Sequence, residues 1–424
     1  MFALRRSSTW LIGVLCLSLL ATACGGGSGR GPAAGGGGGG SEDLKQLEIG
    51  LGYFPFGPMQ RSFVHYDQQK HVIREVAREL GYDLTVEWKQ FPAAPEQLAA
   101  FKSGDVVIGP MATFPLIAQL KAGQRFGVLT NTLGMYRFMV MVRKDGPVKT
   151  FDDLRGARVG VAVGTAHQAA FEQFLLAEFG KPSSELGVQY VNQPVPVPTM
   201  PPGLDAYVTF IPAILPALED PNSNIEPLLY LTPPETGPAY DGPLGPGEGH
   251  EVPSAEKSPF HPEGFTSLRN PFVVTEKFAR EHPDVVQAFV MAHQRVNREL
   301  AALPPEEVTE YWPEETWKRM PRKAFEEQSL AVDLVYDRRD WVWPTKGEVD
   351  IMWTESESMV KMDVIPSPLS GDELAAAFAI TAPILKEAYE ALDSYPDADV
   401  FDDPEATDLR GPPVWEIDWS SYAR

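Results

Sequence analysis

The chain has 424 residues, with 58 acidic side chains against 36 basic ones and a formal net charge of -22 at pH 7. This acidic balance argues against nucleic acids and anionic membranes as partners, because both would be repelled by such a surface. The part of the chain after residue 44 is longer than one hydrophobic core usually serves, so two lobes are expected.

The N-terminus has the pattern of a secretory signal. Two arginines precede an apolar run over residues 9–20, which is too short for a membrane-spanning helix, and small residues then lead to Cys24. This is similar to a bacterial lipobox, in which the cysteine after the cut carries the lipid. We expect a signal peptide over residues 1–23, lipidation of Cys24 and a glycine-rich tether that ends near residue 44, with a plain secreted protein as the alternative. Because Cys16 lies in the signal, no cysteine remains for a disulfide, a thiolate nucleophile or a zinc-thiolate site.

Strand and helix patterns alternate from residue 45 onward. The predicted strands cover residues 47–51, 84–88, 106–109 and 126–129, and the predicted helices cover residues 72–80, 91–105 and 110–123. This order favours a mainly parallel sheet with crossover helices, in which ligands bind beyond the carboxyl ends of the strands. The candidate loops at those ends are residues 53–58, 91–95 and 109–113.

A strand, a tight turn and a helix are predicted within residues 157–180. Valines at every second position indicate the strand, Gly164 ends it, and helical spacing begins at Thr165. Thr165 and the glutamine three residues later fit a capping box, which would leave the amides of Ala166 and His167 facing a space above the strand end. Such a helix start favours an anion or a polar acceptor, and the alternative is an ordinary strand-to-helix corner without a ligand.

The last third of the chain returns to the first lobe. Residues 233–264 are dense in proline and glycine and are interpreted as a surface loop rather than a lid. A strand is predicted over residues 271–275, followed by a helix whose buried stripe is Val285, Phe289, Ala292 and Val296. Ser370 and Glu373 form another capping box, which opens a helix with a bend at Pro383. The acidic tail is expected to be weakly held. The expected lobes are residues 45–140 with 265–424, and residues 141–264.

Five segments occur in the same order as in a known family. They read LEIGLGYFP, VEWKQFPAAPEQLAAFKSGDVVIGP, VRKDGPVKTFDDLRGARVGVAVGTAHQAAFEQFL, GLDAYVTFIPA and NPFVVTEKFAREHPDVVQAFVMAH. Through them the chain resembles bacterial ABC-transporter substrate-binding proteins of the nitrate, sulfonate and taurine type, over roughly residues 47–300. The resemblance implies an α/β fold of the type II periplasmic-binding class, with two lobes, each a mainly parallel sheet with flanking helices, and a ligand cleft between them.

The resemblance also implies where the ligand binds. Carried over position by position, the predicted ligand-binding residues are Tyr53, Phe54, Phe56, Pro110, Met111, Thr113, Tyr136, Arg137, Gly164, Thr165, Ala166, His167, Tyr207 and Phe210. Arg137 and Arg269 lie beside predicted strand ends and are the candidate cations, because a guanidinium suits an oxyanion. Two departures from the family make the cleft less negative. Phe210 is followed by isoleucine rather than by an acid, and Met135-Tyr136-Arg137 replaces small residues.

Catalytic and metal-binding patterns are missing from the sequence. The pairs His65 with His71 and His250 with His261 lack the spacing and the acidic neighbours of a metal site. The sequence contains no nucleophile-elbow, zinc-protease or phosphate-loop motif, and a lone Gly-x-Gly at Gly50 is too weak a signal for a dinucleotide. We therefore predict no cofactor, no metal and no enzymatic activity.

The resulting prediction is a lipid-anchored, extracytoplasmic solute-binding component of an ABC importer. It would act as a monomer, capture a small organic anion of the sulfonate type by closure of its lobes, and deliver it to the permease subunits. Alternatives on the same fold are a phosphonate, an aromatic carboxylate or a pyrimidine-type thiamine precursor as the ligand. An extracytoplasmic enzyme on this scaffold is a different class, for which His167 is the candidate reactive group.

Overall fold

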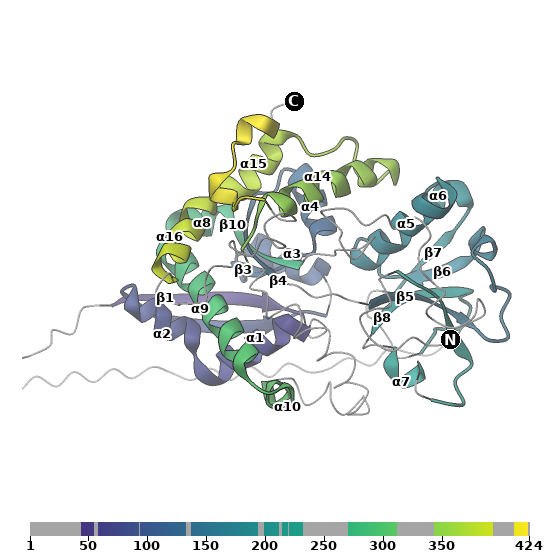
Figure 1. Ribbon diagram of the computed structural model, residues 1–424, viewed down its shortest axis with the longest axis horizontal. Helices are drawn as coiled ribbons and strands as arrows, with labels where there is room; N and C mark the ends of the chain where they lie inside the picture. Colours follow the sequence, from purple (N-terminus) through teal and green to yellow (C-terminus); the bar gives the residue numbers. More distant parts are fainter. Residues whose placement is uncertain are drawn as a thin grey trace, which may run out of the picture. The chain divides into compact units, whose positions relative to one another are not determined.

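Two five-stranded sheets organise the described part of the computed structural model (Figure 1). The described residues are 44–54, 58–92, 94–132, 137–193, 199–211, 214–218, 220–231, 270–311, 343–392 and 411–422. The expected signal peptide, the tether with Cys24, and the loop over residues 233–264 lie outside these ranges.

The first sheet combines strands from two distant parts of the sequence. Its order is β2 (Tyr82–Gln90), β1 (Lys45–Tyr53), β3 (Ile108–Pro110), β10 (Asn270–Thr275) and β4 (Phe126–Thr132). β1 runs parallel to both of its neighbours, whereas β10 is antiparallel to β3 and to β4. The strands predicted from the apolar pattern before residue 132 are confirmed, and a strand from much later in the chain is inserted between the last two.

The second sheet is formed by consecutive segments. Its order is β7 (Gln189–Asn192), β6 (Arg158–Val161), β8 (Ala206–Ile211), β5 (Arg137–Arg143) and β9 (Ile225–Tyr230). β6 is parallel to β7 and β8, and β5 is antiparallel to β8 and β9. The expected boundary after residue 140 falls inside β5, all of which pairs in this second sheet.

Both sheets have the same arrangement of strand directions. In each of them, four described strands run one way and the fifth runs against them, which confirms the mainly parallel fold class. The opposing strand is the first one after the chain passes from the other sheet, namely β5 after β4 and β10 after β9. Because this strand runs backward, its amino end lies at the edge where the other four strands have their carboxyl ends. That edge is where ligands bind in parallel sheets.

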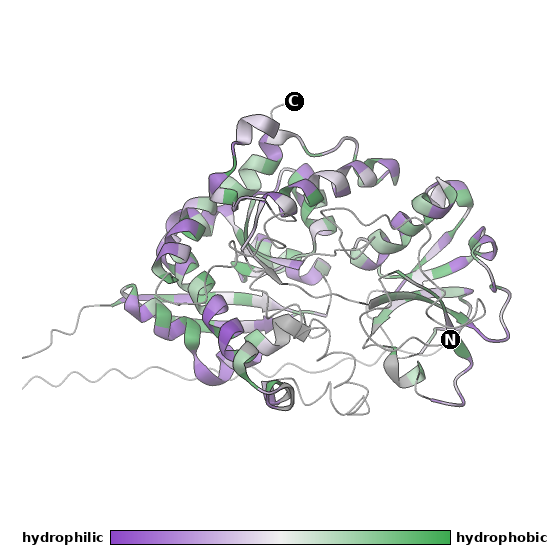
Figure 2. Ribbon diagram, in the orientation of Figure 1, coloured by the Kyte–Doolittle hydropathy of each residue, from purple (hydrophilic) through white to green (hydrophobic). Residues whose placement is uncertain are grey.

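Helices flank the strands of both sheets. The first half of the molecule is the part built on the first sheet, and the second half is the part built on the second sheet. The helices of the first half are α1 (Pro58–Lys70), α2 (Val72–Glu79), α3 (Ala94–Ser103), α4 (Thr113–Lys121), α8 (Glu276–Glu281), α9 (Pro283–Ala302) and α10 (Pro305–Val308) with η4 (Thr309–Tyr311). Those of the second half are η1 (Asp152–Leu154), α5 (Ala166–Phe179), α6 (Ser183–Leu186) and α7 (Leu215–Leu218). Hydrophilic and hydrophobic residues mix along most of the helices (Figure 2), as expected for helices with one face on a sheet. The predicted stripe of α9 is fully buried.

Strand alternation decides which side chains of the second sheet share a face. Phe138, Val140 and Val142 of β5 pack in one hydrophobic cluster, and Met139 and Met141 pack in another. Successive side chains of a strand point to opposite faces, so the two clusters lie on opposite sides of the sheet. β8 behaves in the same way and divides its aromatic residues between the two faces.

The C-terminal segment consists of α14 (Lys346–Lys361), α15 (Gly371–Ala379), α16 (Ala382–Leu392), η7 (Val414–Glu416) and η8 (Trp419–Tyr422). The capping box of Ser370 and Glu373 is confirmed. The predicted long helix is divided before Pro383, at Thr381, whose hydroxyl donates to the carbonyls of Val128 and Phe378. Pro383 then sits in the first turn of α16, where its missing N–H is tolerated.

The expectation of a weakly held tail is wrong for residues 411–422. Val414 is fully buried, and the ring of Trp415 meets those of Trp343 and Tyr389 at centroid distances of 5.8 and 5.4 Å. A Cβ at Gly371 would lie 1.9 Å from a carbonyl oxygen of this segment, so only glycine permits the contact. Aromatic packing therefore holds the end of the chain on the first half, although its acidic composition suggested otherwise.

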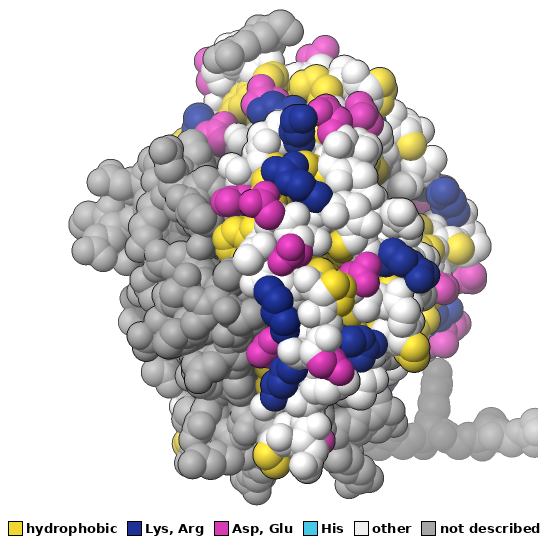
Figure 3. Space-filling view, turned by 90° about the vertical axis from the view of Figure 1, so that its right-hand side faces the viewer, with side chains coloured by type: hydrophobic (Ala, Val, Ile, Leu, Met, Phe, Trp, Pro, Cys, Tyr) yellow, Lys and Arg dark blue, Asp and Glu magenta, His cyan; other side chains and the backbone are white. Residues whose placement is uncertain are grey.

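Lysine and arginine side chains alternate with aspartate and glutamate on the described part of the face shown in Figure 3. Ion pairs of the second half follow the same pattern, for example Lys149 with Glu226 at 3.4 Å and Arg155 with Asp152 at 3.2 Å. On this face the net negative charge of the chain is interspersed with positive charge rather than gathered in one block.

Candidate functional site

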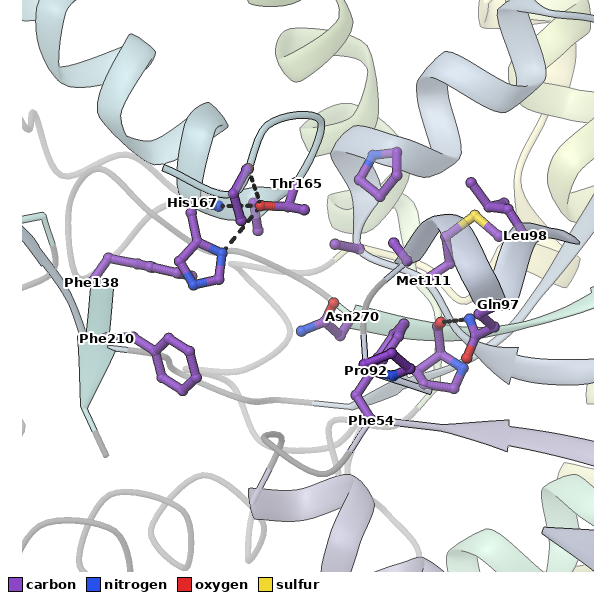
Figure 4. Close-up of a pocket in the computed structure, with 16 residues that line it drawn as sticks. Phe54, Pro92, Gln97, Leu98, Met111, Phe138, Thr165, His167, Phe210 and Asn270 are labelled. Atoms are coloured by element: carbon purple, nitrogen blue, oxygen red, sulfur yellow. Dashed lines mark hydrogen bonds between the residues drawn. The ribbon is translucent and has the colours of Figure 1, made fainter. Parts of the chain in front are cut away.

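A cavity lies where residues of both sheets meet (Figure 4). It contains about 770 Å³ of space not filled by atoms, a volume that includes its opening to solvent. Its lining residues are Phe54, Pro92, Ala94, Gln97, Leu98, Pro110, Met111, Ala112, Pro115, Phe138, Ala162, Thr165, Ala166, His167, Phe210 and Asn270.

The topology of the sheets explains why these residues come together. Phe54, Pro110 and Ala162 end or directly follow parallel strands, and Phe210 is the penultimate residue of β8. The two antiparallel strands contribute from their amino ends, with Phe138 second in β5 and Asn270 first in β10. All of these positions lie at the sheet edge described above, so the cavity occupies the place where open α/β sheets bind ligands.

The start of α5 forms one wall of the cavity. Gly164 adopts a left-handed conformation with φ +77°, which turns the chain between β6 and the helix. The hydroxyl of Thr165 accepts from the amide of His167 at 3.2 Å, and the side chain of Gln168 accepts from the amide of Gly164 at 2.8 Å. Thr165 is the N-cap, as predicted, but neither bond of the predicted capping box forms.

This shift in bonding changes which amides remain available. The amide of His167, which was expected to face a ligand, is already bonded to Thr165. The amide of Ala166 has no acceptor among the described residues and remains at the positive end of the helix dipole.

The ring of His167 is held in one tautomer. The hydroxyl of Thr165 donates to the carbonyl of Ala162 at 2.7 Å, so its only proton is used there. The ring Nδ1, at 3.1 Å from the same hydroxyl oxygen, must then be the donor of the second bond. Nε2 consequently carries a lone pair, is buried, and has no partner among the described residues. Burial lowers the pKa of His167 to about 4, which keeps the ring neutral at pH 7.

Two phenylalanines enclose this imidazole. The ring centroids of Phe138 and Phe210 lie 4.9 and 5.3 Å from that of His167. Phe138 and Phe210 are directly paired across β5 and β8, which places them side by side on one face. The second half thus offers an aromatic wall with one nitrogen acceptor in it.

Gln97 is the corresponding polar group of the first half. It lies on α3, is 1 % exposed, and donates from its amide nitrogen to the carbonyl of Pro110 at 2.6 Å. Its oxygen has no partner among the described residues and lies over two glycines. A Cβ at Gly52 would come within 2.7 Å of that oxygen, and one at Gly109 within 3.2 Å, so both glycines make room for Gln97.

The described lining of the cavity carries no formal charge. Its side chains are apolar or aromatic apart from one asparagine, one glutamine, one threonine and the neutral histidine. The two candidate cations are not among them, because Arg269 and the side chain of Arg137 lie outside the described residues. Among the described residues, three metal-ligating side chains do not come together anywhere.

Half of the fourteen ligand residues predicted by family position line the cavity. They are Phe54, Pro110, Met111, Thr165, Ala166, His167 and Phe210. Phe56, Tyr136 and the side chain of Arg137 lie outside the described residues.

Four further predicted residues lie away from the cavity. Tyr53 is buried with its ring against Trp88 and donates its hydroxyl to Gln90. Thr113 is buried at the start of α4. Gly164 forms the turn between β6 and α5 and is not part of the cavity lining. Tyr207 faces the opposite side of its sheet from Phe210, because the two positions differ by an odd number of residues.

The cavity also contains residues that the sequence reasoning did not single out. Pro92 and Ala94 fall in the candidate loop over residues 91–95, but Gln97 lies two residues beyond it, on α3. Phe138 and Asn270 were missed because the two strands that carry them were not recognised as antiparallel. A predicted reversal at each passage between lobes would have pointed to them, since it brings the amino ends of those strands to the ligand-binding edge.

Two separate sheets whose ligand-binding edges line one cavity define an α/β periplasmic-binding-protein fold. The chain is similar to the alkanesulfonate-binding protein SsuA from Xanthomonas axonopodis pv. citri, with 14% identity over 76% of this chain and 96% of that one and a TM-score of 0.50. The aliphatic sulphonate binding protein SsuA from Escherichia coli gives 13% identity, 78% and 91% coverage and a TM-score of 0.50. The nitrate-binding protein NrtA from Synechocystis PCC 6803 is 12% identical over 83% of this chain and 90% of that one, with a TM-score of 0.52.

These solved structures are solute-binding proteins of the sulfonate and nitrate type, and the likeness establishes the fold. No protein-family model and no curated protein matches the sequence. None of the helices in the described ranges combines the length and the apolar character needed to cross a membrane.

Proposed function

We propose that this protein is the extracytoplasmic solute-binding component of an ABC importer and binds a small organic molecule in the cavity. The observation that carries the proposal is that the ligand-binding edges of two similarly ordered sheets line one largely apolar cavity. A solute that contacts both walls stabilises the conformation in which they surround it, and the permease subunits would recognise that conformation. The similarity of the fold to solute-binding proteins supports this role.

The proposed location follows from the N-terminal sequence. A signal peptide over residues 1–23 and a lipid on Cys24 would place the protein on the outer face of the cell membrane. The glycine-rich tether would let the folded part move toward the permease as a monomer.

The lining favours an uncharged solute over the sulfonate-like anion predicted from the sequence. An anion in a largely apolar cavity needs a cation or several convergent donors, and the described lining contains no lysine or arginine. The amide of Ala166 is the observation that keeps an organic anion as the second candidate. Among the alternatives, a neutral pyrimidine-type ligand fits the described lining better than a phosphonate or an aromatic carboxylate.

An enzyme on this scaffold has less support. His167 is the candidate reactive group, but its pKa of about 4 is far from the value of an effective general base at neutral pH. Its Nδ1 is oriented by a threonine hydroxyl rather than by a carboxylate. These features suit a hydrogen-bonding group better than a proton-transfer group.

A ligand screen tests the proposed function. Full-length protein should show a raised Tm with a subset of small uncharged heterocycles, and native mass spectrometry of freshly purified protein should show a bound small molecule. A probe at 100 times its Kd is expected to stabilise the fold by about 2.7 kcal/mol. Turnover of the bound molecule on long incubation would instead support the enzyme.

The substitution Ala166→Pro separates the two candidate ligand classes. Ala166 is the first helical residue, where proline is favoured, and Thr165 before it has the extended φ of -122° that proline requires. The variant should therefore keep its stability within about 0.5 kcal/mol. The change of interest is that proline at position 166 has no amide N–H to donate. We expect unchanged affinity for an uncharged ligand. A loss of tenfold or more would favour the anion, and Thr165→Ser serves as the control that keeps the cap.

A further inference from the structure

We propose that the cavity recognises its solute mainly by hydrocarbon surface, and that it therefore selects an uncharged ring compound with few polar groups. This inference rests on the proposed function and names the chemistry of its ligand. Two observations on the lining carry it, namely the apolar side chains of both walls and the internal hydrogen bonds that occupy many of its polar groups.

The wall of the first half consists largely of hydrocarbon side chains. Those that line the cavity are Phe54, Pro92, Leu98, Pro110, Met111 and Pro115. Phe54 and Leu98 are half-buried and Pro92 is exposed, so each keeps apolar surface that a solute can cover. The rings that the second half contributes are those of Phe138, His167 and Phe210 (Figure 4). A ring compound that contacts both walls would bury apolar surface against each of them.

Hydrogen bonds within the protein occupy many backbone groups of the lining. Three of its residues are prolines, which have no N–H. The amide of Met111 donates to the carbonyl of Pro271 at 2.9 Å, and that of His167 donates to the hydroxyl of Thr165 at 3.2 Å. The lining carbonyls that already accept a hydrogen bond are those of Pro110, Ala112, Phe138, Ala162, Thr165 and Phe210. A polar solute therefore finds few backbone partners in these walls.

The four polar side chains of the described lining are also engaged or sealed off. The hydroxyl proton of Thr165 and the amide nitrogen of Gln97 are bonded to carbonyls, and Nε2 of His167 is sealed from solvent. Asn270 lies between the two walls in Figure 4 and already has an interaction within the protein. Its amide and the N–H of Ala166 remain as partners for a polar group, but two such contacts do not replace the water around a charged or strongly polar molecule.

Selectivity follows from the cost of removing water from the solute. Charged and polar groups lose their hydration in such a cavity, whereas hydrocarbon groups gain by leaving water. The cavity should therefore discriminate among uncharged solutes as well as against anions. It should prefer an alkylated ring to a ring of the same size that carries a hydroxyl group.

Isothermal titration of the full chain with matched ring compounds tests this inference. The central probe is 4-ethylacetophenone. In 4-(hydroxymethyl)acetophenone a hydroxyl replaces the terminal methyl, and in 4-ethylbenzoate a carboxylate replaces the acetyl group. We expect the ethyl ketone to bind at least ten times more tightly than either of these two. Acetophenone and 4-methylacetophenone complete the series, in which each added carbon should tighten binding about fourfold.

The variant Leu98→Gln assigns the effect to the wall of the first half. Glutamine has a similar length and is also a good helix former on α3, but it replaces hydrocarbon by an amide. The affinity for 4-ethylacetophenone should fall by about fivefold or more, and its ratio to that of the hydroxymethyl ketone should narrow. Leu80→Gln is the matched control, because Leu80 is another half-buried leucine packed on the same core but outside the cavity lining. This control should bind every probe as the wild type does.

The outcomes distinguish the inference from the proposed function. Equal binding of the ethyl and hydroxymethyl ketones, tighter binding of 4-ethylbenzoate, or an equal loss in the two leucine variants would overturn the inference and leave the solute-binding role in place. No binding of any probe up to its solubility would also overturn it. If native mass spectrometry then finds no bound small molecule either, the proposed function is contradicted as well.

Discussion

Replacing His293 by phenylalanine is expected to make the protein markedly more resistant to acid. An unfolded histidine takes up a proton near pH 6.5, whereas His293 in the folded chain does so only near pH 3, because burial lowers its pKa to about 3. Between these two values the unfolded state binds more protons. Unfolding free energy therefore falls as the pH falls from 6.5, by about 3 kcal/mol from this group at pH 4.

The environment of His293 explains the shift. The residue is 2 % exposed, and its ring lies 4.6, 5.3 and 6.3 Å from those of Phe63, Phe272 and Phe289. Its Nδ1 has no partner among the described residues. A proton on this ring would be stranded in an aromatic cluster without a compensating charge, so the neutral form is strongly favoured.

Urea unfolding at pH 7 and pH 4, followed by circular dichroism, measures the effect. His293→Phe keeps an aromatic ring in the cluster and should reduce the loss of unfolding free energy between the two pH values by about 3 kcal/mol. The control is His71→Asn, an exposed histidine in a left-handed conformation that asparagine tolerates. An equal acid loss in the wild type and in His293→Phe would contradict this assignment. His167 should add a smaller loss of the same sign, because its pKa is lowered less.

Glu355→Gln is expected to stabilise the protein at alkaline pH. The effect should be similar in size to that of His293→Phe, but it should appear as the pH rises rather than as it falls. Burial raises the pKa of Glu355 from 4.5 to about 7, and the influence of the neighbouring Thr113 hydroxyl offsets part of this rise. Here the folded state binds the extra proton between pH 4.5 and 7. Stability is therefore greatest below pH 4.5 and decreases as the pH rises through 7, by about 3 kcal/mol in all.

The glutamine variant cannot ionise, so it should be about 3 kcal/mol more stable than the wild type at pH 8 and nearly equal to it at pH 4. The same urea titrations at these two pH values provide the measurement. Glu357→Gln is the matched control, since it is an exposed glutamate on the same helix, α14. A gain at pH 8 that is equal in both variants would show that general charge repulsion, rather than burial of Glu355, is responsible.

Local patterns predicted the elements around the cavity well. The alternation of valines before Gly164 and the helical spacing after it correspond to β6 and α5, with Thr165 as the N-cap. The cap bonds were less predictable. A choice between neighbouring amides depends on small differences in backbone angle after a left-handed glycine, and residue types do not reveal them.

The site was only partly predictable for a different reason. Phe54, His167 and Phe210 come from loops and strand ends that family position identifies, and they line the cavity. Asn270 reaches this edge because β10 pairs with β4, where Asn270 lies opposite Thr132, more than a hundred positions earlier in the chain. No local pattern contains such a pairing. Gln97 is placed by α3 and by its bond to the carbonyl of Pro110, 13 positions further along, which a candidate loop ending at residue 95 did not include.

The amino-acid sequence by itself determined the order of strands and helices, the helix start at Thr165 and the fold class, because these follow from apolar periodicity and short-range capping. Only the tertiary structure decided the direction of β5 and β10, the neutral tautomer of His167 and the uncharged character of the described lining. These properties arise from burial and from contacts between distant segments. The same residues would titrate and bond differently if they were exposed to water.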